Sequence, residues 1–236
     1  MSGASGLIGS ALVQSFESQG YETVRLVRRK PREGNELQWD SGCPISPQLV
    51  SGFDVVVHLS GENIAGRWTQ QKKRRIRDSR IISTRFLADA LAKAAEKPPI
   101  FVCASAIGYY GNRGDEILTE DCPAGDRFFP EVCREWESAT KPASDVGIRV
   151  VKLRTGIVLS RDGGALKQML LPFKLGLGGR VGSGSQYWSW IHIADFVSAV
   201  HHILQNGDVK GAVNMTAPNP VTNAEFTGVL AHVLNR

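Results

Sequence analysis

Three glycines near the start of the chain have a spacing that could bind phosphate. Gly3, Gly6 and Gly9 recur every third residue and lead into an apolar-periodic segment, which predicts a helix from about Leu7 to Ser18. The first N–H groups of a helix lack intrahelical partners and attract negative groups such as phosphate. Glycine also permits a tight turn, close approach of a ligand, and close packing of helix on sheet. The predicted site for the diphosphate of a dinucleotide comprises Gly3, Ala4, Ser5, Gly6, Leu7 and Ile8.

The same spacing also fits an ordinary glycine-rich turn, because the chain has 25 glycines among 236 residues. A dinucleotide turn needs a strand before it, a helix after it, and a residue about 20 positions later that reads the ribose. Only Met1 precedes Ser2. We therefore expect that the first β-strand is missing, or that the start of the chain is misassigned.

Two arginines stand where the ribose-reading residue is expected. Arg28 and Arg29 end a predicted strand that begins near Tyr21. An acidic residue at this place favours a free 2′-hydroxyl, whereas an arginine accommodates a 2′-phosphate. The sequence therefore predicts NADP rather than NAD as the cofactor. The alternative is a basic strand end on the surface.

Hydroxyl groups follow a predicted buried strand in the middle of the chain. Ser105 comes directly after the apolar run Ile100–Ala104, and Tyr109 and Tyr110 follow within five residues. Hydroxyl groups at such a place can polarise a substrate carbonyl or alcohol. Ser105, Tyr109 and Tyr110 are therefore the catalytic candidates, and the alternative is a turn serine with two loop aromatics.

The elements that must position these residues alternate between strand and helix, which predicts an α/β fold with a doubly wound parallel sheet. The buried run Asp54–Leu59 ends in Ser60 and Gly61, whose small size leaves room for a cofactor at the strand end. His58, inside this run, is interpreted as a core residue. Arg80, in a helix predicted from Thr69 to Ala95, points toward the strand ends or forms a surface salt bridge.

The pattern changes after residue 160, where glycines become frequent. Residues 1–160 are predicted to form the dinucleotide-binding domain, and residues 161–236 a substrate-binding region interleaved with the sheet. Within the second part, Asp195 is expected to cap a helix, and Thr222 is expected to form a capping box with Glu225.

Composition narrows the class of protein. The net charge of +5 suits anionic partners, but the basic run Lys72–Arg77 is interpreted as a solvated helix face, so no nucleic-acid partner is expected. The sequence predicts no membrane span, no secretory signal and no metal site, and we expect a cytoplasmic protein with reduced cysteines. The acidic loop from Asn112 to Arg127 is expected to be solvated.

Four sequence motifs resemble those of the extended short-chain dehydrogenase/reductase superfamily. Within it they are most similar to an atypical NAD-dependent-epimerase-like group, which is related to nucleotide-sugar epimerases and is sometimes labelled cell-division-inhibitor-like. They are Gly61–Ile64, Gly108–Gly111, Leu171–Gly179 and Trp190–Ile193. The resemblance spans essentially the entire chain and implies a Rossmann fold, a nicotinamide dinucleotide, a small C-terminal substrate region and frequent homodimers. The cofactor contacts that it implies are the Gly3–Ile8 turn, Arg28, Arg29, Leu59, Ser60, Arg80 and the region of Ile157.

The chain departs from that superfamily at its working pair of residues. Phe129 stands where the superfamily has a tyrosine, Cys133 stands where it has a lysine, and the later Glu137 is retained. A phenyl ring cannot transfer a proton, and a thiol cannot replace an ammonium group. The usual acid/base pair is therefore absent.

Three hypotheses about function follow. The first is an NADP-dependent oxidoreductase or epimerase acting on a small substrate, such as a nucleotide sugar, in which Ser105 orients the substrate oxygen and Tyr109 or Tyr110 is a substitute acid. The second is a non-catalytic NADP(H) sensor or scaffold protein. The third, an α/β-hydrolase, needs Gly-x-Ser-x-Gly, which the segment Gly3–Gly6 misses by one residue.

Overall fold

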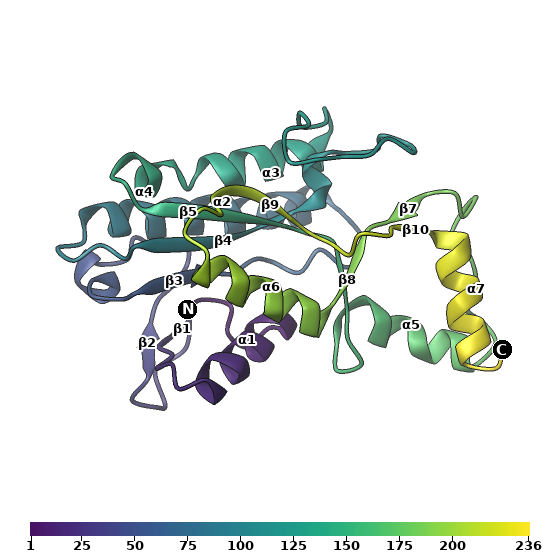
Figure 1. The fold of residues 1–236 in the computed structure, drawn as a ribbon, viewed down its shortest axis with the longest axis horizontal. Coiled ribbons are helices and arrows are strands. Elements are labelled where there is room, and N and C mark those ends of the chain that lie inside the picture. The colour runs from purple at the N-terminus through teal and green to yellow at the C-terminus, as the bar shows by residue number, and fades with distance from the viewer.

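The computed structural model describes all residues from Met1 to Arg236 and has the predicted α/β architecture (Figure 1). Its centre is a parallel sheet of four strands in the order β3, β4, β5, β9. The strands are β3 (Val55–His58), β4 (Ile100–Ala106), β5 (Arg149–Thr155) and β9 (Gly211–Met215).

Met1 and Ser2 connect this sheet to a second parallel pair, β1 (Arg25–Val27) and β2 (Glu36–Gln38). Ser2 forms parallel bridges with Leu26 of β1 and His58 of β3. The Ser2 N–H donates to the Val57 carbonyl at 2.9 Å, and the Leu26 N–H donates to the Met1 carbonyl at 2.7 Å. The strands thus follow the order of a Rossmann sheet, with Met1 and Ser2 in the place of its first strand.

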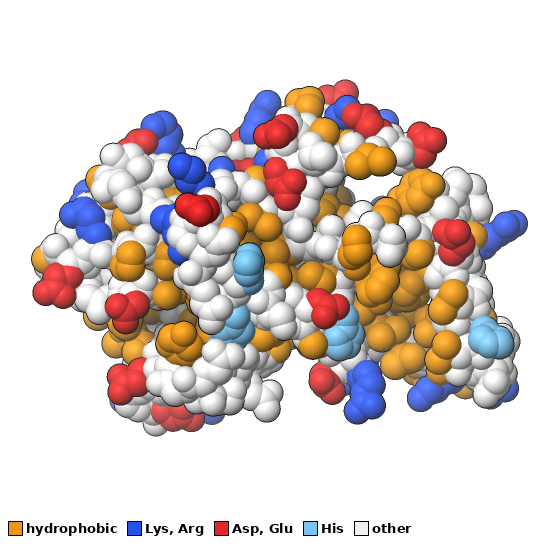
Figure 2. Space-filling view, viewed as in Figure 1, with side chains coloured by type: hydrophobic (Ala, Val, Ile, Leu, Met, Phe, Trp, Pro, Cys, Tyr) orange, Lys and Arg blue, Asp and Glu red, His pale blue; other side chains and the backbone are white.

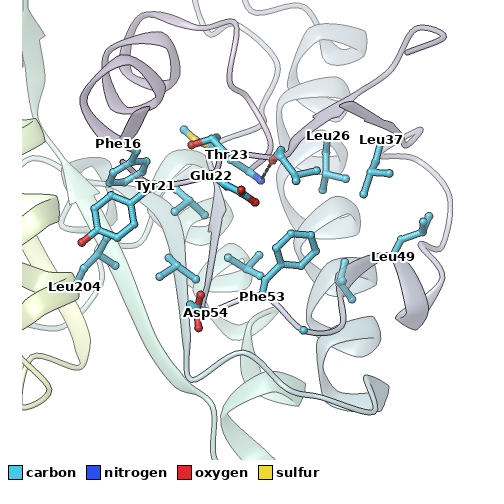
Figure 3. Close-up of a pocket in the computed structure, with 17 residues that line it drawn as sticks. Phe16, Tyr21, Glu22, Thr23, Leu26, Leu37, Leu49, Phe53, Asp54 and Leu204 are labelled. Atoms are coloured by element: carbon cyan, nitrogen blue, oxygen red, sulfur yellow. Dashed lines mark hydrogen bonds between the residues drawn. The ribbon is translucent and has the colours of Figure 1, made fainter. Parts of the chain in front are cut away.

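An apolar cavity of about 400 Å³ lies next to Met1, between the N-terminal ends of β1 and β3 (Figure 3). Phe16, Leu26 and Phe53 are among the apolar side chains that line it. The Met1 amino group donates to the Val24 carbonyl at 2.6 Å, and burial lowers the pKa of this amine to about 6. The first β-strand was expected to be missing. Between β1 and β3, where that strand would lie, only Met1 and Ser2 form backbone hydrogen bonds to the two neighbouring strands.

Helices cover both faces of the sheet. Successive strand side chains alternate between the faces, so Val56 packs in the core on one side and Val57 in the core on the other. Because both faces are covered, β3 and β4 read as nearly continuous apolar runs. On one face lie α2 (Gln70–Lys93), α3 (Phe128–Ser138), α4 (Lys141–Asp145) and the 3-10 turn η1 (Pro47–Val50); on the other lie α1 (Leu7–Ser18) and α6 (Ile193–Gln205).

The second part of the chain is divided between the sheet and a smaller region beside it. α6 and β9 belong to the sheet domain, whereas α5 and α7 lie apart from it (Figure 1). Figure 2 shows hydrophobic side chains gathered beside α5 and α7, and Leu171 and Val229 are each 64% exposed. None of the helices is both long and apolar enough to cross a membrane. The elements of this smaller region are β6 (Ile157–Leu159), α5 (Gly164–Lys174), β7 (Tyr187–Trp188), β8 (Trp190–His192), β10 (Val221–Thr222) and α7 (Asn223–Val233).

The two predicted helix starts in this part have different outcomes. The capping box is confirmed, because the Thr222 hydroxyl accepts from the Glu225 N–H and the Glu225 carboxylate accepts from the Thr222 N–H. The prediction that Asp195 caps α6 was wrong. The helix begins two residues earlier, at Ile193, and the His192 ring accepts from the Ala194 N–H at 3.3 Å. Asp195 instead lies in the first turn, where its charge suits the helix dipole.

Candidate functional site

The glycine turn packs so closely on itself and on the end of β3 that side chains at two of its positions would collide with backbone. Gly3 has a φ of +71°, and a Cβ on it would lie 2.7 Å from the carbonyl carbon of Leu59. A Cβ on Gly9 would collide with the Gly3 carbonyl. α1 begins at Leu7 after Gly6, and no side chain caps its first N–H groups. These groups are therefore available to an anion at the N-terminus of α1.

A buried histidine fixes the position of this turn. Burial keeps His58 neutral and lowers its pKa to about 3. Its Nδ1 lies 2.6 Å from the Ser2 hydroxyl, and its Nε2 lies 3.0 Å from the Ser83 hydroxyl. Because Ser83 donates its own proton to the Ser79 carbonyl, we assign the proton of His58 to Nε2. The interpretation of His58 as a core residue is confirmed, and it links the turn to α2.

A pocket of about 780 Å³ opens in front of the turn and brings together most of the predicted cofactor residues. The glycine turn, the end of β1 and the end of β3 supply its walls. The predicted residues that line it are Gly3, Ala4, Ser5, Gly6, Arg28, Arg29, Leu59, Ser60 and Gly61. Leu7, Ile8, Arg80 and Ile157 are not among its lining residues.

The two predicted phosphate-binding arginines are not equivalent. The Arg29 guanidinium donates to both carboxylate oxygens of Glu36, at 2.8 and 2.6 Å. Glu36 is buried, also accepts from the Arg32 N–H, and has its pKa lowered to about 2, chiefly by Arg29. Arg28 is exposed in the same pocket and forms none of the salt bridges of the chain. Arg28 is therefore the arginine whose charge is free for a ligand.

Arg80 is a second cation without a carboxylate partner. Its guanidinium donates to the carbonyls of Glu62 and Ile76 at 3.0 and 3.1 Å, and lies 5.1 Å from the Trp136 ring. A Cβ on Gly61 would lie 3.2 Å from the Arg80 Cζ, and the buried Nε has no hydrogen-bond partner. Burial lowers the pKa of Arg80. Arg80 therefore places a positive charge directly behind the pocket wall at Gly61.

The Ser105 hydroxyl lies in a buried network around Arg154. It donates to Glu137 at 2.7 Å, and Arg154 donates to both oxygens of the same carboxylate at 2.9 and 3.0 Å. Arg154 also donates to the Tyr110 hydroxyl at 2.9 Å, and Tyr110 donates to the Asn214 side chain at 2.7 Å. Burial raises the pKa of Tyr110. Ser105 and Tyr110 therefore already direct their protons to acceptors within the chain.

Tyr109 has a different environment from Tyr110. It is half-buried, whereas Tyr110 is 2% exposed. Its ring centroid lies 3.5 Å from the Cζ of Arg154, and none of the hydrogen bonds of this network involves its hydroxyl. The structure thus brings all three hydroxyl candidates around Arg154. Sequence reasoning missed Arg154 and Asn214, although an arginine in the apolar strand β5 was a pattern that could have pointed to a buried ion pair.

The positions of the absent acid/base pair are apolar. The Phe129 ring packs against Gly108, where a Cβ would collide with it. Cys133 is 1% exposed, and burial raises the pKa of its thiol to about 12. Neither side chain can exchange a proton near neutral pH.

The sequence profile of the NAD dependent epimerase/dehydratase family matches residues 1–216. An epimerase family protein of Mycobacterium bovis is 44% identical over 239 residues, which cover 100% of this chain and 78% of that protein. The crystal structure of human epimerase family protein SDR39U1 with NADPH has a TM-score of 0.89 at 36% identity, covering 100% of this chain and 79% of the human one. A nucleoside-diphosphate sugar epimerase from Corynebacterium glutamicum has a TM-score of 0.86 at 41% identity, covering 99% of this chain and 50% of that chain.

Proposed function

The chain belongs to the NAD dependent epimerase/dehydratase family, and on this basis we propose that it binds NADP(H) in the pocket in front of the glycine turn. We further propose that it is an oxidoreductase or epimerase acting on a small substrate of the nucleotide-sugar type. When bound, the nicotinamide supplies or accepts a hydride. The chain supplies the glycine turn, the charges and the polar groups around it.

The residues present fit such a cofactor. The uncapped start of α1, with Leu7 and Ile8 in its first turn, would hold the diphosphate, and Gly3 and Gly9 let the turn pack closely on itself and on the end of β3. Leu59, Ser60 and Gly61 would line the adjacent wall. Arg80, whose guanidinium lies behind Gly61, would place a positive charge beside this wall. Ile157, where the chain passes from β5 into the smaller region, would line the nicotinamide end.

Arg28 supports a preference for NADP over NAD. Both arginines are exposed in the pocket, but the charge of Arg28 is not compensated by a salt bridge, whereas that of Arg29 is compensated by Glu36. We therefore assign the 2′-phosphate to Arg28, with Arg29 remaining paired to Glu36 in the pocket wall. A human relative was crystallised with NADPH, which supports the choice of NADP.

For the reaction, we propose that Tyr109 takes the role of substitute acid. The hydroxyls of Ser105 and Tyr110 are directed to Glu137 and Asn214, so they are better suited to positioning than to proton transfer. Residues 161–236, which include α5 and α7 beside the sheet domain, would contribute to binding of the substrate. A homodimer stays a prediction, which light scattering at two protein concentrations would check.

The second candidate function is a non-catalytic NADP(H) sensor or scaffold protein. The apolar Phe129 and the protonated Cys133 thiol at the positions of the usual acid/base pair favour it. It predicts cofactor binding without turnover on a panel of carbonyl compounds and nucleotide sugars, whereas the first candidate predicts turnover that Tyr109→Phe abolishes and Tyr110→Phe does not.

The observation that carries the proposal is the glycine turn at the start of α1, and a matched pair of variants tests it. Gly3 and Gly20 both have positive φ, +71° and +83°, but a Cβ on Gly20 meets nothing within 4 Å. Both alanine variants therefore strain the backbone, but only in Gly3→Ala does the added Cβ collide with the Leu59 and Ser60 backbone and displace the turn. We expect wild type and Gly20→Ala to bind NADPH at tens of micromolar or tighter in a fluorescence titration, and Gly3→Ala to bind at least tenfold more weakly. No binding by the wild type would overturn the proposal.

A further inference from the structure

Three aromatic side chains gather beside the start of α3, outside the cofactor pocket. The rings of Trp68 and Phe129 are stacked, with centroids 5.6 Å apart and planes at 28°. Phe128 meets Trp68 edge to face, with centroids 6.0 Å apart. Trp68 is 39% exposed, and both phenylalanines are half-exposed. A stacked, accessible aromatic surface of this kind is unusual for side chains that serve only the core.

Neighbouring groups hold this aromatic surface in place. The Trp68 indole N–H donates to the Ile64 carbonyl at 2.7 Å. The Phe129 ring packs directly against Gly108, where any side chain would displace it. The ammonium group of Lys73 lies 5.3 Å from the centroid of the Phe128 ring. The rings are therefore pre-organised, which lowers the entropic cost of binding a ligand on them.

The aromatic surface lies between the two parts of the candidate site. On one side, Ile64 directly follows Asn63, which lines the cofactor pocket. On the other side, Gly108 is three residues beyond Ser105, which lies in the Arg154 network. The rings therefore contact chain segments that adjoin both the cofactor pocket and the Arg154 network.

We propose that Trp68, Phe128 and Phe129 bind a planar conjugated ring of the substrate by stacking. This proposal rests on the proposed function, because it assigns the rings to a substrate that lies beside the cofactor. The chemistry of the surface favours a conjugated ring over a saturated sugar ring. Sugar hydroxyls need hydrogen-bond partners around the ring, but the indole N–H is already donated to Ile64 and the phenyl rings have none.

Two further features agree with a conjugated ring. Lys73 places a cation at the edge of the surface, where it suits a ring carbonyl or an acidic ring substituent. Phe129 supports the exposed Trp68 ring by stacking on it and has no proton to transfer, so its position is suited to binding and not to proton transfer. Both a nucleobase and a larger fused ring, such as that of a flavin, have this chemistry.

The test measures the binding of riboflavin, uridine and glucose by equilibrium dialysis. A matched control is available because Tyr21 and Phe16 form another aromatic pair, with centroids 6.0 Å apart, at the cavity beside Met1, and Tyr21 is also exposed. We expect riboflavin or uridine to bind wild type and Tyr21→Leu equally, and Trp68→Leu at least tenfold more weakly. The tighter of the two ligands identifies the source of the ring, and glucose is expected not to bind.

Titration of the same variants with NADPH separates this proposal from the proposed function. Trp68 does not line the cofactor pocket, so Trp68→Leu is expected to keep the NADPH affinity of the wild type, which also shows that the variant is folded. If no variant binds NADPH, the proposed function fails and the ring measurement still stands. The ring proposal is overturned if neither ring compound binds, if Trp68→Leu leaves their binding unchanged, or if glucose shows the same dependence on Trp68.

Discussion

The assignment of the 2′-phosphate to Arg28 makes a prediction that distinguishes two adjacent arginines. Arg28 lies in the pocket and forms no salt bridge within the protein. Arg28→Ala therefore removes a guanidinium whose charge is available to the bound phosphate. A hydrogen bond to a charged group contributes about 1.5–3 kcal/mol. Arg28 is exposed, and solvent screening places its contribution at the lower end, about 1.5–2 kcal/mol. This corresponds to a loss of roughly 10- to 30-fold in NADPH affinity.

NADH lacks the 2′-phosphate, so its affinity for Arg28→Ala is expected to stay within about threefold of the wild-type value. The assay is a fluorescence titration of each variant with NADPH and with NADH at one fixed salt concentration, and the readout is the ratio of the two dissociation constants. Using the ratio removes general effects of the substitution on folding or on the glycine turn.

The matched control for Arg28 is the double variant Arg29→Ala/Glu36→Gln. Arg29→Ala alone would leave the buried Glu36 carboxylate unpaired in the pocket, where it would repel the phosphate. The double variant removes the ion pair as a neutral unit, and we expect it to retain the NADPH preference of the wild type. If the double variant loses as much preference as Arg28→Ala, or if Arg28→Ala keeps it, the reasoning from the Glu36 ion pair is refuted.

Three further predictions concern the stability of the fold. His58 stays neutral in the folded state because its pKa is about 3, whereas in the unfolded chain it takes up a proton below its ordinary pKa of about 6.5. The stability that it contributes is therefore present above pH 6.5 and is lost as the pH falls toward 3, at up to about 1.4 kcal/mol per pH unit. In denaturant unfolding, the free energy of unfolding of wild type should fall more steeply over this window than that of His58→Gln. Glu137→Gln leaves the buried Arg154 charge uncompensated, so the free energy of unfolding should fall by about 3 kcal/mol or more. The double variant Glu137→Leu/Arg154→Met removes both charges and should recover part of this loss. Equal losses in the single and double variants would show that the unpaired charge is not the cause. Four apolar β-branched residues added before Met1 should raise Tm relative to four added Gly and Ser residues. The cavity beside Met1 is apolar, and each apolar side chain buried in it would contribute about 1.5–3 kcal/mol. Identical Tm values for the two extended chains would mean that the cavity does not accept a strand.

The sheet and its helices could be predicted from the sequence because the underlying patterns are local. The apolar run Asp54–Leu59 predicted a strand that is buried on both faces. β3 is such a strand, because its side chains pack into the cores on both sides of the sheet. The place of the glycine turn also followed from spacing alone. The strand predicted from Tyr21 to Arg29 is limited to Arg25–Val27, because β1 finds partners only in β2 and in Met1 and Ser2.

The parts that could not be predicted depend on pairs that are distant in sequence. The compensation of Arg29 by Glu36 and the network that joins Ser105, Glu137 and Arg154 bring side chains together across the sheet. The acidic loop from Asn112 to Arg127 illustrates the same limit. Most of its residues are exposed, as expected, but Arg154 donates to the Glu120 carbonyl and the Glu120 carboxylate accepts from the Asn214 N–H, which ties one part of the loop to the ends of β5 and β9.

The most direct test of the central claim is a crystal structure of this chain with NADPH. We expect electron density for the diphosphate at the first turn of α1, above Gly3 and Gly6, and for the 2′-phosphate within hydrogen-bond distance of Arg28, with Arg29 still paired to Glu36. Density for the 2′-phosphate on Arg29, or for the cofactor outside this pocket, would contradict this claim.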